Sequence, residues 1–577
     1  MLLSLKGIRA TTFFALAILA GTVLFLAASE PVEAADFTVT KTADTADGTC
    51  DADCSLREAI GAANAASGPH NIALPAGTYT LTIAGAGEDA NATGDLDYEE
   101  TTTINGTDSA TTIIDGGDID RVFHTVMGPG LTLNGVTVQN GDAGSDDGGG
   151  IFSGGAVTLN TSTVTSNEAD QGAGIAAPNI TMVSSHVDAN TSADQGGGIW
   201  WCCSDAAYTI TDSTVDDNVA GDQGGGVFQC CDDFTLVITN SSVSRNQAAD
   251  QGGGVFFCCG DEGPVNMTIS GSKIDDNTST DQGGGFFYCC GSDGADTITL
   301  TNSSFSGNDA ESDGGGIFIC CTATGGTNST MSGITVANNV TTSGGQGGGI
   351  YVDGTATITN STIHNNVGNS DGGGIRCGEA ELSLTNVTIT DNTTEAFDSG
   401  GGVNCSEFEA LNTIIAGNVD EGGVAPDCFG TLNSLGNNLV QDVTGCTIAG
   451  DTAGNITGVD PALGALAFNG GATQTRAVSP GTPPYNAGRN AGCPATDQRT
   501  VARPQEGTCE IGAYEFQVIT PSPSPAPGTP TQAPAALPPT GGAAEDGASQ
   551  AWLMAIGALA VAAVAGVGTF AVVRRRL

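Results

Sequence analysis

The sequence predicts an all-β protein, a right-handed parallel β-helix in which short coils stack into a solenoid. A glycine triplet followed by an apolar residue recurs nine times between Gly148 and Gly400, and Gly172-Ala173-Gly174 is a variant of it. Each of these ten units leads into a Val/Ile/Thr-rich segment that ends in an apolar-x-x-Asn pattern. The 87 glycines and the low charge content of 14% disfavour helix as the main element. Units of 23 to 31 residues with short β-type segments are typical of solenoid coils.

Stacked coils lie about 4.8 Å apart, so equivalent residues should form columns along the stack. We expect a buried column from the residue after each triplet: Ile151, Ile175, Ile199, Val227, Val255, Phe286, Ile317, Ile350, Ile375 and Val403. The next position predicts an aromatic column, which should lie on the most distinctive face: Phe152, Trp200, Phe228, Phe256, Phe287, Phe318 and Tyr351. The recurrent asparagines are expected to form a ladder of side-chain amides: Asn167, Asn190, Asn218, Asn246, Asn277, Asn308, Asn339, Asn366, Asn392 and Asn418.

Both ends of the chain carry targeting patterns. Residues 1–34 hold Lys6 and Arg9, an apolar run over 13–28 and the small-residue sequence Val32-Glu33-Ala34, which predicts a secretory signal peptide rather than an uncleaved anchor. Residues 551–573 are free of charge and precede three arginines at 574–576. This run predicts a transmembrane helix with its C-terminus in the cytoplasm and the remaining chain outside the cell.

The motif before that span, Leu537-Pro538-Pro539-Thr540-Gly541, resembles the LPxTG sorting signal of Gram-positive surface proteins. The resemblance implies cleavage between Thr540 and Gly541 by a sortase and covalent attachment of Thr540 to cell-wall peptidoglycan. The Pro/Ser/Thr-rich residues 518–536 would then form an extended spacer. Chance is the alternative explanation, because proline-rich sequence easily produces Leu-Pro-Pro.

Two flanking segments resemble known bacterial surface proteins. The run Cys54-Ser55-Leu56-Arg57-Glu58-Ala59-Ile60 matches the signature of CSLREA-domain proteins, and the amphipathic residues 55–66 predict a capping helix. Residues 426–517 are similar to the choice-of-anchor Q region, and the repeats resemble those of polymorphic outer-membrane proteins. The implied organisation is a signal peptide (1–34), an N-terminal cap (35–69), β-helix repeats (70–425), final coils with a C-terminal cap (426–517), a spacer (518–536) and a sorting region (537–577).

The 18 cysteines of an exported chain predict disulfides. Ten of them form adjacent pairs at the base of inserted loops: Cys202-Cys203, Cys230-Cys231, Cys258-Cys259, Cys289-Cys290 and Cys320-Cys321. Parity favours vicinal bonds, inter-coil bonds fit the coil spacing, and a metal site is the third interpretation. For the other cysteines, position predicts a bridge between coils from Cys377 to Cys405, and proximity predicts the pairs Cys50–Cys54, Cys428–Cys446 and Cys493–Cys509.

Aspartates also recur in register, each followed by glutamine: Asp170, Asp194, Asp222, Asp250 and Asp281. Like charges about 5 Å apart repel each other unless something neutralises them. One hypothesis is a column of calcium ions held by these carboxylates and backbone oxygens. The alternative is an acidic stripe solvated by water and counter-ions. No other cofactor is expected.

The net charge of −49 excludes nucleic acid as a partner. It also disfavours enzymes that act on acidic polysaccharides, since these need a cationic cleft. The four histidines, His70, His124, His186 and His364, show no metal-ligand spacing. The sequence therefore favours a wall-anchored, adhesin-like or structural surface module that contacts glycans or other surface proteins. The alternative is a β-helix enzyme that degrades neutral polysaccharides.

Overall fold

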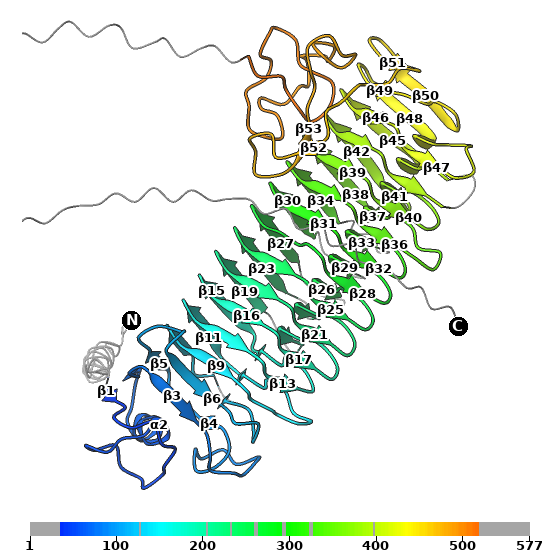
Figure 1. Cartoon of the computed structure of the whole chain (residues 1–577). Coiled ribbons are helices and arrows are strands. Elements are labelled where there is room, and N and C mark those ends of the chain that lie inside the picture. The colour runs from blue at the N-terminus through cyan, green and yellow to red at the C-terminus, as the bar shows by residue number, and fades with distance from the viewer. Residues whose placement is uncertain are drawn as a thin grey trace, which may run out of the picture. The chain divides into compact units, whose positions relative to one another are not determined.

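The computed structural model describes residues 35–518, except 126–127, 203–205, 231–232, 259–263, 291–295, 322–326 and 396–398. It confirms the predicted parallel β-solenoid, whose coils stack from β1 (Ala35–Thr38) to β51 (Ile456–Thr457) (Figure 1). The expected signal peptide, sorting motif and transmembrane span lie outside the described residues. Among the residues that are described, no helix is long and apolar enough to cross a membrane.

A typical coil contains four short strands that belong to three sheets. In one coil these are β22 (Val227–Gln229), β23 (Phe234–Thr239), β24 (Ser242–Ser244) and β25 (Gln247–Ala248). The first two strands join the 27-stranded sheet A, the third joins sheet B and the fourth joins the 10-stranded sheet C. Sheet B consists of two seven-stranded parts that are linked through bridges at Lys273. All these pairings are parallel, as stacking of equivalent segments requires.

The core lies inside the coils and begins with the predicted aliphatic column. All ten residues that follow the glycine triplets are at most 1% exposed, from Ile151 to Val403. Each pairs in register with its equivalent in the next coil, as Val227 does with Val255. Because side chains alternate across a strand, the residue after each of these points to the outer side of sheet A.

Two close contacts, in addition to the backbone conformation, explain why these triplet positions must be glycine. The first glycine has a positive φ, and a Cβ added to Gly224 would lie 2.6 Å from the Cβ of Phe228 in the outer column. A Cβ on the third glycine of the same triplet, Gly226, would lie 2.9 Å from the side-chain nitrogen of Asn246. The first glycine therefore leaves room for an aromatic residue and the third for a ladder asparagine.

The buried asparagines form a continuous ladder along the turn between sheets B and C. The Nδ2 of Asn246 donates to the Oδ1 of Asn277 at 3.0 Å and to the carbonyl of Val215 in the preceding coil at 2.8 Å. The Oδ1 of Asn277 also accepts the backbone N–H of Asn246 at 3.0 Å. All hydrogen-bonding groups of each internal amide are thus satisfied, which a buried polar group requires.

The same pattern runs without interruption from Asn167 to Asn418. At its C-terminal end Asn418 donates to Asp427, whose Oδ1 accepts both the backbone and the side-chain N–H at 3.1 and 2.9 Å. A carboxylate accepts hydrogen bonds and donates none, so Asp427 ends the ladder. Burial raises the pKa of Asp427 to about 6.

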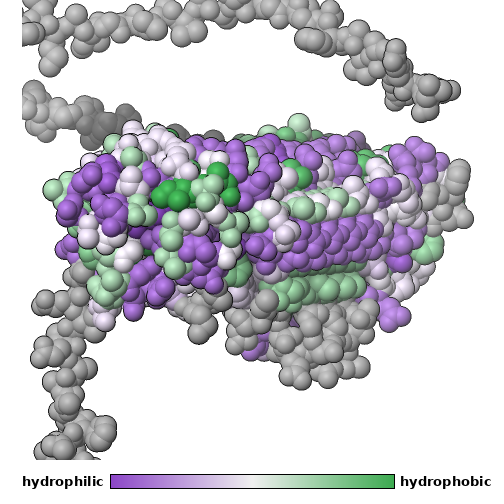
Figure 2. All heavy atoms as spheres, turned by 90° about the horizontal axis from the view of Figure 1, so that it is seen from below, coloured by the Kyte–Doolittle hydropathy of each residue, from purple (hydrophilic) through white to green (hydrophobic). Residues whose placement is uncertain are grey.

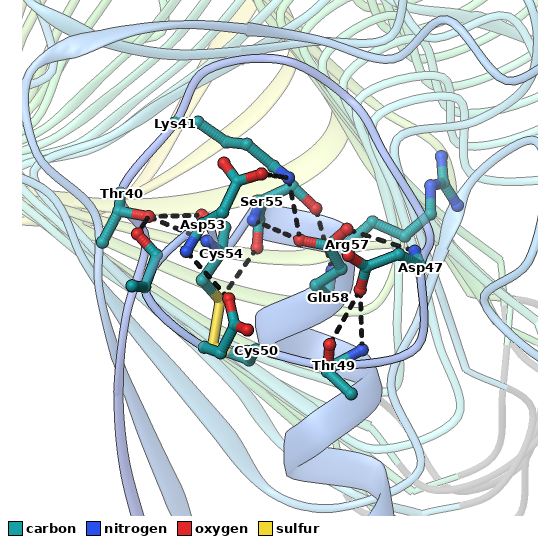
Figure 3. Close-up of a disulfide and its surroundings, with 12 residues drawn as sticks. Thr40, Lys41, Asp47, Thr49, Cys50, Asp53, Cys54, Ser55, Arg57 and Glu58 are labelled. Atoms are coloured by element: carbon teal, nitrogen blue, oxygen red, sulfur yellow. Dashed lines mark hydrogen bonds and ion pairs between the residues drawn. A yellow bond between two sulfur atoms is a disulfide. The ribbon is translucent and has the colours of Figure 1, made fainter.

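The N-terminal cap contains the expected helix, α2 (Leu56–Ala65). Ser55 and Glu58 form a capping box, in which the Ser55 side chain accepts from the Glu58 N–H and Glu58 accepts from the Ser55 N–H at 2.8 Å. A disulfide between Cys50 and Cys54 and the ion pair of Glu58 with Lys41 close the preceding loop (Figure 3). Burial opposes ionisation of Glu58, but hydrogen bonds from the Ser55 N–H, the Thr45 hydroxyl and the Asp47 N–H lower its pKa to about 2.

Arg57 connects this cap to the first coils. Its guanidinium pairs with Asp44 at 2.8 Å and donates to the carbonyls of Gly94 and Asp95, both at 2.7 Å. The arginine thereby fixes the loop that leads into β4 (Leu96–Asp97).

The C-terminal residues 460–517 fold back along the outer side of sheet B, where Figure 1 shows β52 (Leu466–Ala467) and β53 (Thr475–Arg476) beside the coils. The Gln498 amide donates to the carbonyl of Ile334 and the hydroxyl of Thr335, both at 3.1 Å, and Thr473 donates to the carbonyl of Gly333 at 2.8 Å. The segment therefore covers the turns of several coils.

The ladder predicts a specific loss of stability when one rung is removed. Asn277→Ala leaves the Asn246 amide without its acceptor, and an unsatisfied buried polar group costs about 1–3 kcal/mol. We expect the free energy of unfolding in urea to fall by about 3 kcal/mol, and hydrogen exchange at the Asn246 N–H to accelerate. The control Asn266→Ala, on the exposed side of β27 (Val265–Ser270), should change the free energy of unfolding by less than about 0.5 kcal/mol. Equal losses in the two variants would contradict a structural role of the ladder.

Candidate functional site

The outer column of sheet A carries the predicted aromatic residues. Neighbouring rings of Phe228, Phe256, Phe287 and Phe318 stack with centroids 4.9 to 5.1 Å apart, and Tyr351 continues the stack at 4.9 Å. The predicted column is therefore confirmed, but the four phenylalanines are at most 4% exposed, so their rings are covered and do not form a contact face. The column contributes to stability through ring stacking, and only its ends at Phe152 and Tyr351 are half-buried.

The cysteines beside this column bond across coils. Cys202 is bonded to Cys230 of the next coil, with the two Cα atoms 4.9 Å apart. The predicted vicinal bonds Cys202–Cys203 and Cys230–Cys231 are therefore wrong. The coil spacing places equivalent cysteines within disulfide reach, whereas adjacent Cα atoms are only about 3.8 Å apart.

The next three cysteines of the column, Cys258, Cys289 and Cys320, lie in register on β26 (Val255–Cys258), β29 (Phe286–Cys290) and β33 (Ile317–Cys321). The sulfurs of Cys289 and Cys320 are 2.9 Å apart, and neither Cys258 nor Cys320 forms a disulfide. The predictions for Cys203, Cys231 and Cys259 lie outside the described residues, and Cys290 and Cys321 are described through their backbone alone.

The remaining disulfides agree with the sequence predictions. Cys377 bridges to Cys405 of the next coil, and the local pairs are Cys50–Cys54, Cys428–Cys446 and Cys493–Cys509.

The aspartate column is held together by the glutamines that follow it in the sequence. Gln171 donates to Asp194 at 2.9 Å, Gln223 to Asp250 at 3.1 Å and Gln251 to Asp281 at 2.9 Å. Backbone hydrogen bonds of 2.8 to 2.9 Å connect Asp170, Asp194, Asp222, Asp250 and Asp281 in sequence. Burial and the charges of Asp250 and Asp194 raise the pKa of Asp222. The recurrent Asp-Gln pair therefore reduces repulsion between stacked carboxylates through amide donors.

A cluster of buried charged residues lies at the N-terminal end of the outer column. His124, in the middle of β7 (Phe123–Thr125), pairs in register with Asp97 of β4 and with Phe152 of β10 (Ile151–Ser153). The Nδ1 of His124 lies 2.9 Å from an Asp97 oxygen, and 3.7 and 3.9 Å from oxygens of Asp89 and Asp95.

Arg121 neutralises part of this cluster. Its Nε lies 3.0 Å from Asp95, its terminal nitrogen lies 3.4 Å from Asp146, and its guanidinium carbon lies 5.7 Å from the centroid of the Phe152 ring. Burial, with the charges of Asp97 and Asp120, raises the pKa of Asp95 to about 8. Burial also raises the pKa of Asp120.

A second feature is an open groove of about 660 Å³ on the outer side of sheet A, near its C-terminal end. It lies over β38 (Thr355–Thr359), β42 (Glu381–Thr385), β45 (Val403–Leu411) and β48 (Cys428–Leu435). Its lining includes four exposed glutamates, Glu379, Glu381, Glu407 and Glu409. In the pairing of β45 with β48, the register shifts between Asn404 and Glu407, which interrupts the regular strand pairing beside the groove.

The surface around such features is organised in rows. On the face seen in Figure 2, stripes of hydrophilic residues run along the stack from coil to coil beside paler and more hydrophobic stripes. This arrangement follows from stacking, since each position of the repeat contributes one row.

Neither the charged cluster nor the groove was predicted from the sequence. The register of His124 with Phe152 was an available signal, because each follows a core residue, Phe123 or Ile151, in equivalent strands. Asp89 reaches the cluster through the non-repetitive loop before β4, and the groove forms where the repeat changes. Periodicity alone therefore could not place either of them.

No protein-family model matches the chain, and no curated protein matches it. Among solved structures, the A-module of the mannuronan C-5 epimerase AlgE6 from Azotobacter vinelandii is similar to this chain, with 14% sequence identity and a TM-score of 0.24. The match covers 74% of this chain and 100% of that module. A similarity at this level carries no argument about function.

Removal of the inter-coil disulfide between Cys202 and Cys230 should lower the stability of the protein substantially. The double substitution Cys202→Ser and Cys230→Ser removes a cross-link between residues that are 28 positions apart in the sequence. Loss of such a cross-link should lower the free energy of unfolding by about 3.5 kcal/mol. Urea unfolding should show this loss, whereas Cys258→Ser, which breaks no disulfide, should lose less than about 1 kcal/mol. Mass spectrometry of the non-reduced wild type should find Cys202 linked to Cys230. A Cys202–Cys203 bond in that digest would contradict the pairing.

Proposed function

We propose that the chain is a secreted protein of the cell surface whose β-solenoid acts as an adhesin-like or structural module. The observation that carries the proposal is the stack itself. Its coils are hydrogen-bonded to both neighbours, the asparagine ladder ends in Asp427, and α2 packs against the first strands. Such a stack holds its surface rows in fixed positions without a cofactor. Disulfides between coils support an oxidising, extracytoplasmic location.

The proposed attachment uses the sorting motif. A sortase would cleave between Thr540 and Gly541 and transfer Thr540 to peptidoglycan, while residues 551–573 hold the chain in the membrane until cleavage. The resemblance of residues 54–60 to CSLREA-domain surface proteins supports the same location. Hydrogen bonds give three residues of that segment a structural role. Ser55 and Glu58 cap the helix, and Arg57 fixes the loop that leads into the first coils.

Substitution of the threonine at the expected cleavage site tests the attachment. In a host with a housekeeping sortase, Thr540→Ala should leave the protein extractable by detergent, while the wild type should be released only by digestion of the cell wall. Thr531→Ala, in the proline-rich spacer, is the matched control and should behave as wild type. A wild type that detergent already extracts would show that residues 551–573 are the anchor and that the motif has no role.

The proposed contact surface for glycans is the groove on sheet A. Its four glutamates lie beside Thr355, Thr357 and Ser383, so carboxylate and hydroxyl groups are available to bind sugar hydroxyls, and the Asn433 amide donates to Glu407. The strands hold these groups at fixed register, with Glu409 opposite Ser383 and Asn433. The negative charge disfavours uronates, which leaves neutral glycans as the class of ligand.

The same groove supports the alternative of a polysaccharide-degrading enzyme, because glycoside hydrolysis uses a pair of carboxyl groups. On a glycan array, Glu381→Gln with Glu409→Gln should weaken retention on neutral glycans by about 10-fold, since hydrogen bonds to charged groups are worth roughly 1.5–3 kcal/mol. Glu421→Gln, on an exposed turn outside the groove, should have no effect. New reducing ends that disappear with the double variant would favour the enzyme, and no difference between the variants would remove the groove from either function.

A further inference from the structure

The charged cluster at the N-terminal end of the outer column has the geometry of a metal site. One ligand atom each from Asp89, Asp97 and His124 lies within 4.8 Å of the other two. The individual distances from His124 Nδ1 are 2.9 Å to Asp97 and 3.7 Å to Asp89. Ligand atoms that share an ion at bond lengths of about 2.0–2.2 Å are separated by roughly 3 to 4 Å. The three side chains therefore need little movement to bind one ion.

The electrostatic balance of the cluster requires a cation. Asp95, Asp97 and Asp120 are at most 5% exposed, and Arg121 is the single permanent cation that pairs with them among the described residues. The other buried guanidinium nearby, that of Arg57, is paired with Asp44. Three buried carboxyl groups therefore share one guanidinium, and a cation bound beside them would favour their ionised forms. Unpaired buried charge is costly, and a divalent ion supplies the missing charge.

A buried residue whose backbone contacts Asp97 supports the same conclusion. The backbone N–H of Asn91 donates to the second carboxylate oxygen of Asp97 at 2.9 Å, so Asn91 lies next to the cluster. Its side chain is 6% exposed, its Nδ2 donates to the carbonyl of Arg57, and its Oδ1 has no hydrogen-bond partner. A buried carbonyl oxygen without a donor is rare and is a suitable ligand for a cation.

The positions of the groups also separate ligands from supporting residues. Asp95 is bound to Arg121 at 3.0 Å and is 3.9 Å from the histidine nitrogen, so it contributes charge rather than a bond. The Phe152 ring lies 5.5 Å from the His124 ring and limits its rotation. Asp89 is 75% exposed and stands on the loop before β4, which gives the ion access from solvent.

We propose that Asp89, Asp97 and His124 bind one divalent transition-metal ion, of the Mn²⁺ or Zn²⁺ class, at the N-terminal end of the outer column of sheet A. A donor set of one imidazole nitrogen with carboxylate oxygens suits these ions, whereas Ca²⁺ takes six to eight oxygen ligands. This site is distinct from the aspartate column, and it does not depend on the proposed surface function.

Binding of Mn²⁺ to the secreted protein in about 150 mM NaCl, where surface charges are screened, tests the proposal. Electron paramagnetic resonance should show one tight Mn²⁺ per chain with coupling to a ¹⁴N nucleus. Asp89→Asn, at an exposed position that folding does not need, should weaken binding by at least about 10-fold. His124→Gln should abolish the nitrogen coupling. Zn²⁺ should displace Mn²⁺, and an equal concentration of Ca²⁺ should not.

Asp146→Asn is the matched control, because it removes one exposed carboxylate that contacts Arg121 without being a ligand. It should change the affinity for Mn²⁺ by less than about twofold. The proposal is overturned if Asp146→Asn weakens binding as much as Asp89→Asn, if bound Mn²⁺ shows no nitrogen coupling, or if Ca²⁺ displaces it equally. Each of these results would indicate attraction of ions to a polyanionic surface instead of coordination.

Discussion

In each internal rung of the asparagine ladder, one buried amide binds the preceding rung, the next rung and two backbone groups. This requirement constrains the rest of the coil. The asparagine in the turn between sheets B and C must occupy the same position in every coil, so this turn is the invariant part of the repeat. The third glycine of each triplet has to lack a side chain because the amide lies against it. Variation in coil length is then left to the loops within sheet A and to the connection between sheets C and A, which is longer from Asn339 to Gly347 than from Asn308 to Gly314.

The same spacing explains which sequence predictions succeeded. Buried and polar columns repeat at one position per coil, so the aliphatic column, the ladder and the Cys377–Cys405 bridge could be derived from the alignment of repeats. The vicinal cysteine prediction was wrong because counting thiols ignored the stacking that brings Cys202 to Cys230. The aromatic column was predicted correctly, but its burial was not, because ring stacking between coils and the adjacent turn cover the rings.

Features that do not repeat could not be derived in this way. The cluster around His124 depends on Asp89 from a loop that occurs once and that Arg57 fixes from the cap. The groove depends on Glu379, Glu381, Glu407 and Glu409, which belong to two consecutive coils and have no glutamate counterparts in the coil before them. Both features lie on the outer side of sheet A. The charged cluster and the groove thus both occur where the regular repeat of the coils is interrupted.

The ladder also has a direction. In every rung one side-chain N–H donates to the C-terminal neighbour and the side-chain oxygen accepts from the N-terminal one, so the amide dipoles add along the stack as peptide dipoles do in a helix. The positive end of this row meets the carboxylate of Asp427, and the polarity of the row therefore favours an acid at that end. A whole coil can be added or removed between the ends without changing either terminal contact. The length of such a rod is thus free to vary by duplication, while its two ends remain chemically different.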